Sequence, residues 1–232
     1  MKSILKSYNI DVDCAYIIRI KNNEQSERLA FEAAESCVLV GMPYEFWDAY
    51  DGLQNPIKES IHHGQFMKMV KLTNHFLTRG EVACALSHIS LWVKCVEEDK
   101  PIVILEHDAL MIKPYRKHQI LNSICYLGGI EQSKQKWPVL PYPPNGSEGH
   151  NVRFICRAHA YAIDPDVAKN MLAMILHQGI YFSLDVMLRS DLFALHQLDL
   201  YATDRGNSSN LDNTTILNRD YGKMYRNDGL LY

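Results

Sequence analysis

The chain has 232 residues, 47% hydrophobic and 22% charged, which is typical of one globular domain rather than a disordered or coiled-coil protein. Its net charge is -3, so it lacks the positive excess that phosphate neutralisation requires, and we expect no nucleic-acid partner. Its apolar runs are too short to span a bilayer or to form the core of a secretory signal, so we expect a cytoplasmic protein. The six cysteines form no CxxC pair, which favours buried free thiols over zinc ligands or a disulfide framework: Cys14, Cys37, Cys84, Cys95, Cys125 and Cys156.

Strands and helices are expected to alternate in the first part of the chain. Residues 15–20 form a short apolar run with β-branched side chains, which predicts a strand. Residues 24–36 place small and apolar side chains at helical spacing, and the apolar residues 37–40 predict a second strand. Prolines and glycines interrupt the pattern over 42–65, which indicates a long connection.

The next helix has a clear start signal. Thr78 and Glu81 match a capping box, in which each side chain binds a free backbone N–H at the helix end. Pro101 ends this helix, and the apolar residues 102–105 predict a central buried strand. That strand runs into the charged triplet Glu106-His107-Asp108. Open α/β sheets bind ligands beyond the carboxyl ends of their strands, so the triplet indicates a site.

The second half of the chain continues the alternation. The predicted elements are a helix over 114–127, a mobile loop over 128–149, a strand over 153–163, a helix from Asp164-Pro165 to near Gly179, a short helix over 182–189 and a strand over 195–202. We therefore expect an α/β fold with a mixed, mostly parallel central sheet flanked by helices. We expect one domain over 1–232, with the tail from about residue 213 peripheral to it.

The charged triplet offers hard oxygen ligands. Glu106 and Asp108 flank one residue, so on an extended segment their side chains point the same way and reach one cation. Such a pair suits Mg²⁺ or Mn²⁺ bridging to a diphosphate. His107 could add an imidazole ligand, hydrogen-bond a ribose or phosphate, or point into the structure. The alternative for the whole triplet is a solvated strand end that carries an acid–base surface pair.

Several stretches in order resemble glycosyltransferase family 25, which includes bacterial lipooligosaccharide galactosyltransferases and collagen hydroxylysine galactosyltransferases. The most specific are residues 79–92 (RGEVACALSHISLW) and 105–109 (LEHDA). Further similar stretches are 17–20 (IIRI) with Glu27 and Arg28, 47–52 (WDAYDG), 159–163 (HAYAI) with Ala168, and 184–185 (LD).

The resemblance implies a GT-A fold and an inverting transfer of a hexose, usually from UDP-galactose, to a saccharide hydroxyl. It also implies a role in lipopolysaccharide synthesis, with a glycolipid acceptor reached at the cytoplasmic face of a membrane. The family's triplet is usually Glu-Asp-Asp, whereas this chain has His107 in the middle. If the central acid contacts donor or metal, His107 weakens metal dependence, changes the donor or abolishes activity. If Glu106 and Asp108 carry the metal, little changes.

The resemblance also suggests which residues bind substrate. Asp185 is the candidate general base, or alternatively a helix N-terminal acid favoured by the helix dipole. An aromatic side chain can stack on uracil, an acid can accept from ribose, and arginine can bind a diphosphate. The residues expected to bind the donor are Arg28, Trp47, Asp48, Asp51, Gly52, Ser87, His88 and His107. His159 is expected to bind the acceptor, and so are Trp137 and Tyr142, which are chosen not from the resemblance but because aromatic side chains in the predicted loop offer flat apolar faces to sugar rings.

Each of these assignments has a structural alternative. Asp51-Gly52 is also typical of a turn, Arg28 of a solvated helix surface, and His88 of a hydrogen-bonded packing residue. His159 could equally be a buried strand residue, and the aromatic pair Trp137 and Tyr142 could pin their loop to the body instead of covering an acceptor.

Two other functions compete with transfer. One is a non-catalytic module of the same fold that binds a nucleotide-sugar or a glycan. The other is a nucleotidyltransferase, which calls for a Gly-rich phosphate loop near the first strand, where residues 21–24 (KNNE) have no glycine. In the tail, Arg219, Lys223 and Arg226 fall at helical spacing, which suits either a peripheral contact with anionic lipid or a solvated segment.

Overall fold

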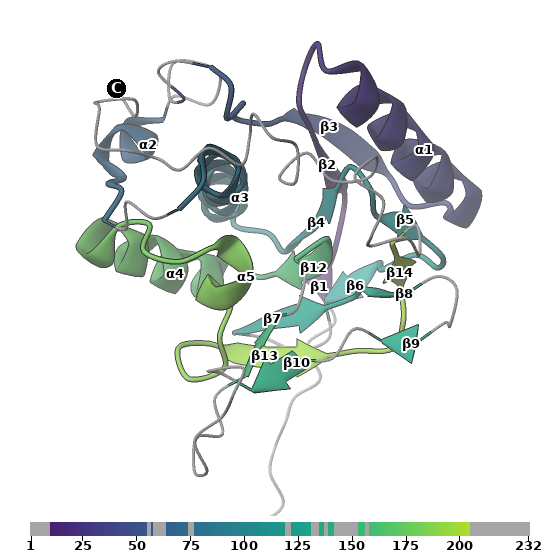
Figure 1. Ribbon diagram of the computed structural model, residues 1–232. Helices are drawn as coiled ribbons and strands as arrows, with labels where there is room; N and C mark the ends of the chain where they lie inside the picture. Colours follow the sequence, from purple (N-terminus) through teal and green to yellow (C-terminus); the bar gives the residue numbers. More distant parts are fainter. Residues whose placement is uncertain are drawn as a thin grey trace, which may run out of the picture.

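The computed structural model describes residues 10–54, 57, 64–73, 77–118, 122–130, 135–136, 139–141, 153–155 and 158–204 (Figure 1). The helices in these ranges are α1 (Glu24–Val40), α2 (Gln65–Met69), α3 (Arg79–Glu98), α4 (Pro165–Gln178) and α5 (Leu184–Met187). The strands are β1 (Ile10–Asp11), β2 (Ala15–Arg19), β3 (Tyr44–Asp48), β4 (Ile102–Glu106), β5 (Leu110–Met111), β6 (Lys117–His118), β7 (Ser123–Tyr126), β8 (Gly129–Ile130), β9 (Gln135–Lys136), β10 (Val139–Pro141), β11 (Arg153–Ile155), β12 (Ala160–Ile163), β13 (Ala194–Gln197) and β14 (Ala202–Thr203).

A six-stranded sheet organises the molecule. Its strand order is β13-β7-β12-β4-β2-β3, and the other strands pair in twos. Strand β2 runs parallel to β3 and β4, and β13 runs parallel to β7. Strand β12 is antiparallel to both of its neighbours, β4 and β7. The prediction of a mixed, mostly parallel sheet flanked by helices is therefore confirmed.

The sheet separates two hydrophobic layers. Helix α1 covers one face, and α3 and α4 pack together on the other (Figure 1). Side chains alternate between the two faces along a strand. In β4, Val103 and Leu105 accordingly belong to the α1 layer, whereas Ile102 and Ile104 belong to the α3 layer. This alternation decides which way the residues at the end of β4 point.

Helix α3 begins and ends where the sequence predicts. The Thr78 hydroxyl accepts from the Glu81 amide at 3.2 Å, and the Glu81 carboxylate accepts from the Thr78 amide at 2.8 Å. The capping box is therefore present. The helix then buries Leu86, Ile89 and Trp92 against the sheet.

The predicted strand over residues 37–40 is wrong, because this segment is the last turn of α1. Cys37 is fully buried on the inner side of the helix, while Val38 and Leu39 are 64% and 86% exposed. Gly41, with a φ of 68°, ends the helix in the left-handed region. The strand that follows is β3, inside the segment predicted to be a connection. The prediction failed because a run of four apolar residues is compatible with either a strand or the half-exposed end of a helix.

The predicted helix over 114–127 is also wrong, because the segment contains β6 and the fully buried strand β7. Strand β7 lies between β12 and β13, and its side chains enter both hydrophobic layers, Ile124 and Tyr126 on the α3 side and Cys125 on the α1 side, so the sequence shows an uninterrupted apolar run. The loop predicted over 128–149 contains β8, β9 and β10 among its described residues. The single strand predicted over 153–163 is two strands, β11 and β12, and the strand over 195–202 is divided between β13 and β14.

The helices α4 and α5 follow the prediction. Asp164 caps α4 by accepting from the amides of Asp166 and Val167, and Pro165 opens the helix. The five described cysteines are free, as predicted, and Cys156 lies outside the described residues. None of the helices in the described part of the chain is both long and apolar enough to cross a bilayer. The tail, with Arg219, Lys223 and Arg226, also lies outside the described residues.

Gly41 and Gly64 form a matched pair that tests the end of α1. A Cβ added at either residue meets no atom within 4 Å, but φ is 68° at Gly41 and -62° at Gly64. We expect Gly41→Ala to lower the free energy of unfolding by about 1 kcal/mol, because an alanine is strained in the left-handed region. Gly64→Ala should change it by less than about 0.5 kcal/mol. Urea unfolding measures both, and equal effects would contradict the assigned helix end.

Asp164 allows a test by pH. Burial raises the pKa of this carboxyl, but the nearby His118 imidazole and the hydrogen bonds from the amides of Val167 and Ser123 lower it by more, so the net shift is downward. A lowered pKa means that ionised Asp164 stabilises the fold above its ordinary pKa of about 3.9, and that this stabilisation disappears as the pH falls through the folded-state value.

We therefore expect Asp164→Asn to destabilise the protein by about 1–3 kcal/mol at neutral pH and by less in acid. Urea unfolding at several pH values measures the difference. Asp166→Asn is the control, because that side chain is 68% exposed in the same helical turn. A cost that does not change with pH would show that the charge of Asp164 is not the stabilising feature.

Candidate active site at the end of strand β4

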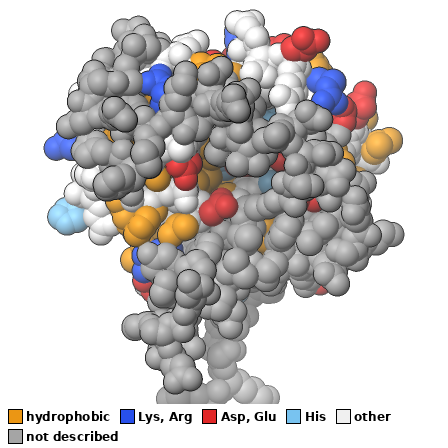
Figure 2. Space-filling model, in the orientation of Figure 1, with side chains coloured by type: hydrophobic (Ala, Val, Ile, Leu, Met, Phe, Trp, Pro, Cys, Tyr) orange, Lys and Arg blue, Asp and Glu red, His pale blue; other side chains and the backbone are white. Residues whose placement is uncertain are grey.

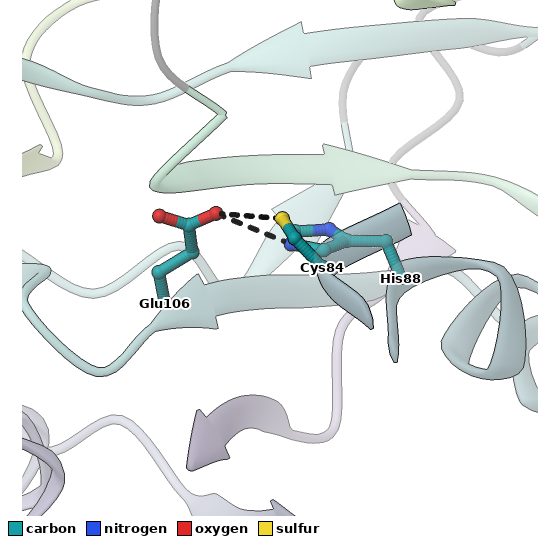
Figure 3. Close-up of side chains that lie close together, drawn as sticks. All are labelled: Cys84, His88 and Glu106. Atoms are coloured by element: carbon teal, nitrogen blue, oxygen red, sulfur yellow. Dashed lines mark hydrogen bonds and ion pairs between the residues drawn. The ribbon is translucent and has the colours of Figure 1, made fainter. Parts of the chain in front are cut away.

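Glu106 ends β4 and points to the same face as Ile102 and Ile104, toward α3. Its Oε1 lies 3.4 Å from His88 Nε2 and 3.6 Å from Cys84 Sγ. The other carboxylate oxygen points away from both groups (Figure 3). The Glu106 side chain is 30% exposed and that of His88 is 1% exposed. One oxygen is therefore held by the protein and the other is presented outward.

The residues that hold Glu106 come from one side of α3. Cys84, His88 and Trp92 are spaced four residues apart, which places them one above another on the helix. His88 Nδ1 lies 2.8 Å from the hydroxyl of Tyr161 on β12, and Trp92 Nε1 donates to the same hydroxyl at 3.0 Å. The imidazole of His88 is thereby fixed between Tyr161 and Glu106.

The charges around Glu106 favour its ionised form. Burial raises the pKa of this carboxyl, but His88, with His107 and His159, outweighs burial and lowers the pKa well below its usual range. The opposite holds for Cys84, whose thiol pKa is raised by burial and by the carboxylates of Glu106 and Asp185. The carboxylate of Glu106 therefore lies beside the protonated, uncharged thiol of Cys84.

The start of β12 completes this side of the site. The Glu106 amide donates to the carbonyl of His159 at 2.8 Å, and the His159 ring packs edge-on against Tyr126. The Ala158 amide donates to Asp185 Oδ1 at 3.0 Å. The predicted base Asp185, in the first turn of α5, therefore lies on the same side of the sheet as Glu106 and close enough to Cys84 to raise its pKa.

The premise that an extended segment carries both Glu106 and Asp108 is wrong. Strand β4 ends at Glu106, and the chain turns there, with the Ala109 amide donating to the Glu106 carbonyl at 3.0 Å. His107 points to the α1 layer, where its Nδ1 is 3.4 Å from the Ser26 hydroxyl. Glu106 and His107, the first two residues of the triplet, therefore point to opposite faces of the sheet.

Trp47 and Ser87, both predicted to bind the donor, have polar contacts within the protein. Trp47 Nε1 donates to the Ser90 hydroxyl at 2.9 Å, and its ring meets Tyr16 edge-on. The Ser87 hydroxyl accepts from the Tyr50 amide at 2.9 Å. These contacts attach β3 and the residues after it to α3, which favours a packing role for both side chains.

Asp48 and Asp51 also have partners nearby. Asp48 forms an ion pair with Arg19 at 3.2 Å, across neighbouring strands. Asp51 Oδ1 accepts from the Leu53 amide at 2.9 Å, which is the turn that was the alternative for this segment.

Gly52 and Arg28 complete the predicted donor set. The Gly52 carbonyl accepts from Arg79 Nε at 2.5 Å, at the start of α3. Arg28 is 57% exposed and forms an ion pair with Glu32 one turn further along α1. The predicted acceptor residues Trp137 and Tyr142 lie outside the described residues.

The sequence interpretation missed Cys84, Trp92 and Tyr161 as parts of the site. The signal was available, because Cys84, His88 and Trp92 share a four-residue spacing in a helix whose start was recognised. The contribution of Tyr161 has no local signal. It depends on the pairing of β12 with β4, which brings a strand more than fifty residues later in the chain beside Glu106.

The donor atoms around Glu106 fit Mn²⁺ or Mg²⁺ poorly. Cys84 Sγ, His88 Nε2 and a Glu106 oxygen all lie within 4.8 Å of one another, and Asp108 is not in this group. Mn²⁺ and Mg²⁺ prefer oxygen ligands, whereas a thiol and an imidazole suit softer ions. The expected Mn²⁺ or Mg²⁺ site on Glu106 and Asp108 stays a prediction.

The surroundings of the site mix acidic and apolar groups. Figure 2 shows acidic side chains next to hydrophobic ones near the middle of the face drawn, in the region of α3, α5 and β12. Sugars present both hydroxyls and apolar ring faces, so such a surface offers suitable contacts for them.

Gly128 tests whether the position of His159 is fixed by packing. A Cβ at residue 128 would lie 2.4 Å from Cε1 and 2.5 Å from Nε2 of His159. We expect Gly128→Ala to displace that ring and to lower the free energy of unfolding by about 1–3 kcal/mol. Urea unfolding measures the loss against Gly64→Ala, where the added methyl meets open space. Equal stability of the two variants would mean that the ring moves at no cost.

Comparison with known proteins identifies the family. The sequence matches the family described as Glycosyltransferase family 25 (LPS biosynthesis protein) over residues 13–188. It is also 42% identical over 72 residues to the Lipooligosaccharide biosynthesis protein lic2B of Haemophilus influenzae. That similarity covers 30% of this chain and 25% of the relative, so the alignment spans about a quarter of the relative's length. The family match covers most of the chain and includes Cys84, His88, Glu106 and Asp185: the chain belongs to glycosyltransferase family 25.

Proposed function

We propose that the chain is a glycosyltransferase that moves a hexose, galactose by resemblance to its family, from a UDP-sugar to a saccharide hydroxyl with inversion at the anomeric carbon. The observation that carries the proposal is the position of the partly exposed Glu106 at the end of a central strand, with Asp185 on the same side of the sheet; the lowered pKa of Glu106 supports it. Both residues lie within the segment that matches the family.

The sheet supports a nucleotide-sugar as donor. Strands β3, β2 and β4 are parallel neighbours, so their carboxyl ends share one edge, and Glu106 belongs to that edge. Open α/β sheets bind nucleotides at this edge. We therefore propose a GT-A fold, with the donor placed beyond the ends of β2 and β4.

Asp185 is proposed as the general base. Its Oδ1 accepts the Ala158 amide, which orients the carboxylate. In an inverting transfer, the acceptor oxygen attacks the anomeric carbon and loses its proton to the base, while the bond from that carbon to the diphosphate oxygen breaks and UDP leaves. A carboxylate at hydrogen-bonding distance from the acceptor hydroxyl can take this proton.

Glu106 is proposed to contact the donor through its outward oxygen. Its other oxygen accepts a hydrogen bond from the Cys84 thiol and faces His88 Nε2 at 3.4 Å, so the carboxylate is oriented before substrate binds. A group that is oriented in advance loses less free energy when substrate binds.

The position of His107 favours an active enzyme over a non-catalytic binding module. This residue replaces the usual central acid of the family, but its ring lies by Ser26 in the α1 layer, away from the face that carries Glu106. The replacement therefore leaves the contacts of Glu106 with His88 and Cys84 in place, while His107 itself helps to lower the pKa of Glu106.

The biological setting is proposed from the family and the relative. The family is described as containing an LPS biosynthesis protein, and the relative is named for lipooligosaccharide biosynthesis. We propose that the acceptor is the growing saccharide of a surface glycolipid, and that the chain acts in the cytoplasm, at the inner face of the membrane where such glycolipids are extended.

The proposal is tested by NMR-monitored consumption of a panel of UDP- and GDP-sugars, with and without saccharide acceptors. We expect one donor to be consumed, and Asp185→Asn to lower kcat by about 100-fold or more with little change in KM for the donor, because a general base contributes about that factor. The asparagine keeps the acceptor oxygen for the Ala158 amide, so the fold should be retained.

The matched control is Asp166→Asn, which removes an exposed carboxylate from the first turn of another helix. Its kcat should equal that of the unaltered protein. Full activity in Asp185→Asn would remove that residue from the role of base. Tight binding of one donor with no turnover under any condition would favour the non-catalytic module.

A further inference from the structure

Cys84, His88 and Glu106 bring three potential ligand atoms together, and the two separations from the Glu106 oxygen match those of a metal centre. A tetrahedral ion with usual bonds to sulfur, nitrogen and oxygen holds its nitrogen and oxygen ligands about 3.4 Å apart and its sulfur and oxygen ligands about 3.6 Å apart. In this structure, His88 Nε2 is 3.4 Å from Glu106 Oε1, and Cys84 Sγ is 3.6 Å from the same oxygen. All three atoms lie within 4.8 Å of one another (Figure 3).

His88 supplies a second, independent observation. Its side chain is 1% exposed, and its Nε2 is buried and makes no hydrogen bond within the described part of the chain. The 3.4 Å to Glu106 is longer than the 2.7–3.2 Å of an ordinary N–H···O bond. A buried nitrogen that lacks such a bond is costly unless another group, such as a cation, satisfies it.

The other nitrogen of His88 is arranged as in a metal-binding histidine. Histidines that bind a metal through one ring nitrogen usually hydrogen-bond through the other, and this second partner fixes the ring. Here Nδ1 is 2.8 Å from the Tyr161 hydroxyl, which also accepts from Trp92 Nε1 at 3.0 Å. With Nε2 bound to a cation, Nδ1 would carry the proton and donate to Tyr161.

The charge of the cluster also favours a cation. The Glu106 carboxylate lies 3.6 Å from the Cys84 sulfur, so the potential at the sulfur is negative. A divalent cation would offset this potential and allow the thiol to bind as a thiolate, releasing its proton to solvent.

We propose that Cys84, His88 and Glu106 form a binding site for a borderline divalent transition metal of the Zn²⁺ or Co²⁺ class. A thiolate, an imidazole and a carboxylate oxygen are the ligand types that Zn²⁺ takes in proteins. Three protein ligands leave a fourth tetrahedral position, as in catalytic rather than structural zinc sites. Metal binding here does not depend on the proposed sugar transfer, and either can hold without the other.

Cobalt provides the direct test. The full chain is purified, treated with a chelator, dialysed and titrated with Co²⁺ under anaerobic conditions. We expect about one equivalent of Co²⁺ to bind with a tetrahedral visible spectrum and a thiolate-to-cobalt charge-transfer band in the near ultraviolet. The band requires a bound sulfur, so metal that binds elsewhere through surface histidines does not produce it. Saturating Co²⁺ without this band would overturn the proposal.

Variants assign the band to these residues. Cys84→Ser should abolish the charge-transfer band and weaken Zn²⁺ binding, measured by competition with a chelating dye, by about 10-fold or more. Cys14→Ser is the matched control, because Cys14 is also a partly buried thiol but is outside the cluster. It should keep both the band and the affinity. Loss of the band in Cys14→Ser, or its persistence in Cys84→Ser, would contradict the assignment.

Tyr161→Phe tests the support of His88 without removing a ligand. We expect it to keep the charge-transfer band but to weaken Zn²⁺ binding by about 10-fold, the usual effect of losing a partner behind a metal ligand. Circular dichroism checks that each variant is folded. An unchanged affinity in folded Tyr161→Phe would contradict the role proposed for Tyr161.

Discussion

The structure depends on strand β4 being buried from both sides. Its alternate side chains enter the α1 layer and the α3 layer, and both layers exclude water from them. Burial of this kind stabilises a strand through its whole length and fixes the face of every residue, because a slip of one residue would exchange the two faces. At the end of the strand, Glu106 therefore points to the α3 layer and His107 to the α1 layer.

The chemistry of the site follows from that constraint. Glu106 reaches α3 because it continues the series of Ile102 and Ile104, and it meets the side of α3 that carries Cys84 and His88. Pairing with β12 adds Tyr161 behind His88. His107 departs from the family's usual triplet. Its side chain points to the α1 layer, as those of Val103 and Leu105 do, and lies by Ser26. His107 nevertheless contributes to the lowered pKa of Glu106, so a change at this position still acts on Glu106 through its charge.

The surroundings of Glu106 differ from a simple pair of carboxylates. One of its oxygens is held by a thiol and an imidazole, and the other points away from them. Asp185 contributes a second negative charge from α5, and its carboxylate is oriented by a backbone amide. The arrangement separates the group that we propose to contact the donor from the group that we propose to act on the acceptor. The thiol of Cys84 and the imidazole of His88 also make the surroundings of Glu106 suitable for softer metal ions than Mn²⁺ or Mg²⁺.

Several features were determined by the sequence alone. The capping box at Thr78, the proline after Asp164 and the apolar run before Glu106 predicted α3, α4 and β4, because each depends on neighbours a few residues away. The family also followed from short motifs, and the same motifs led us to propose a site at Glu106. Local pattern did not separate the end of α1 from a strand, nor β7 from a helix, because short apolar runs are compatible with either. Only the tertiary structure decided that Trp47 packs against Tyr16, that Asp48 pairs with Arg19, and that Cys84, His88, Tyr161 and Asp185 gather around Glu106. The physical reason is that these contacts join segments far apart in the chain, and strand pairing and helix packing bring them together.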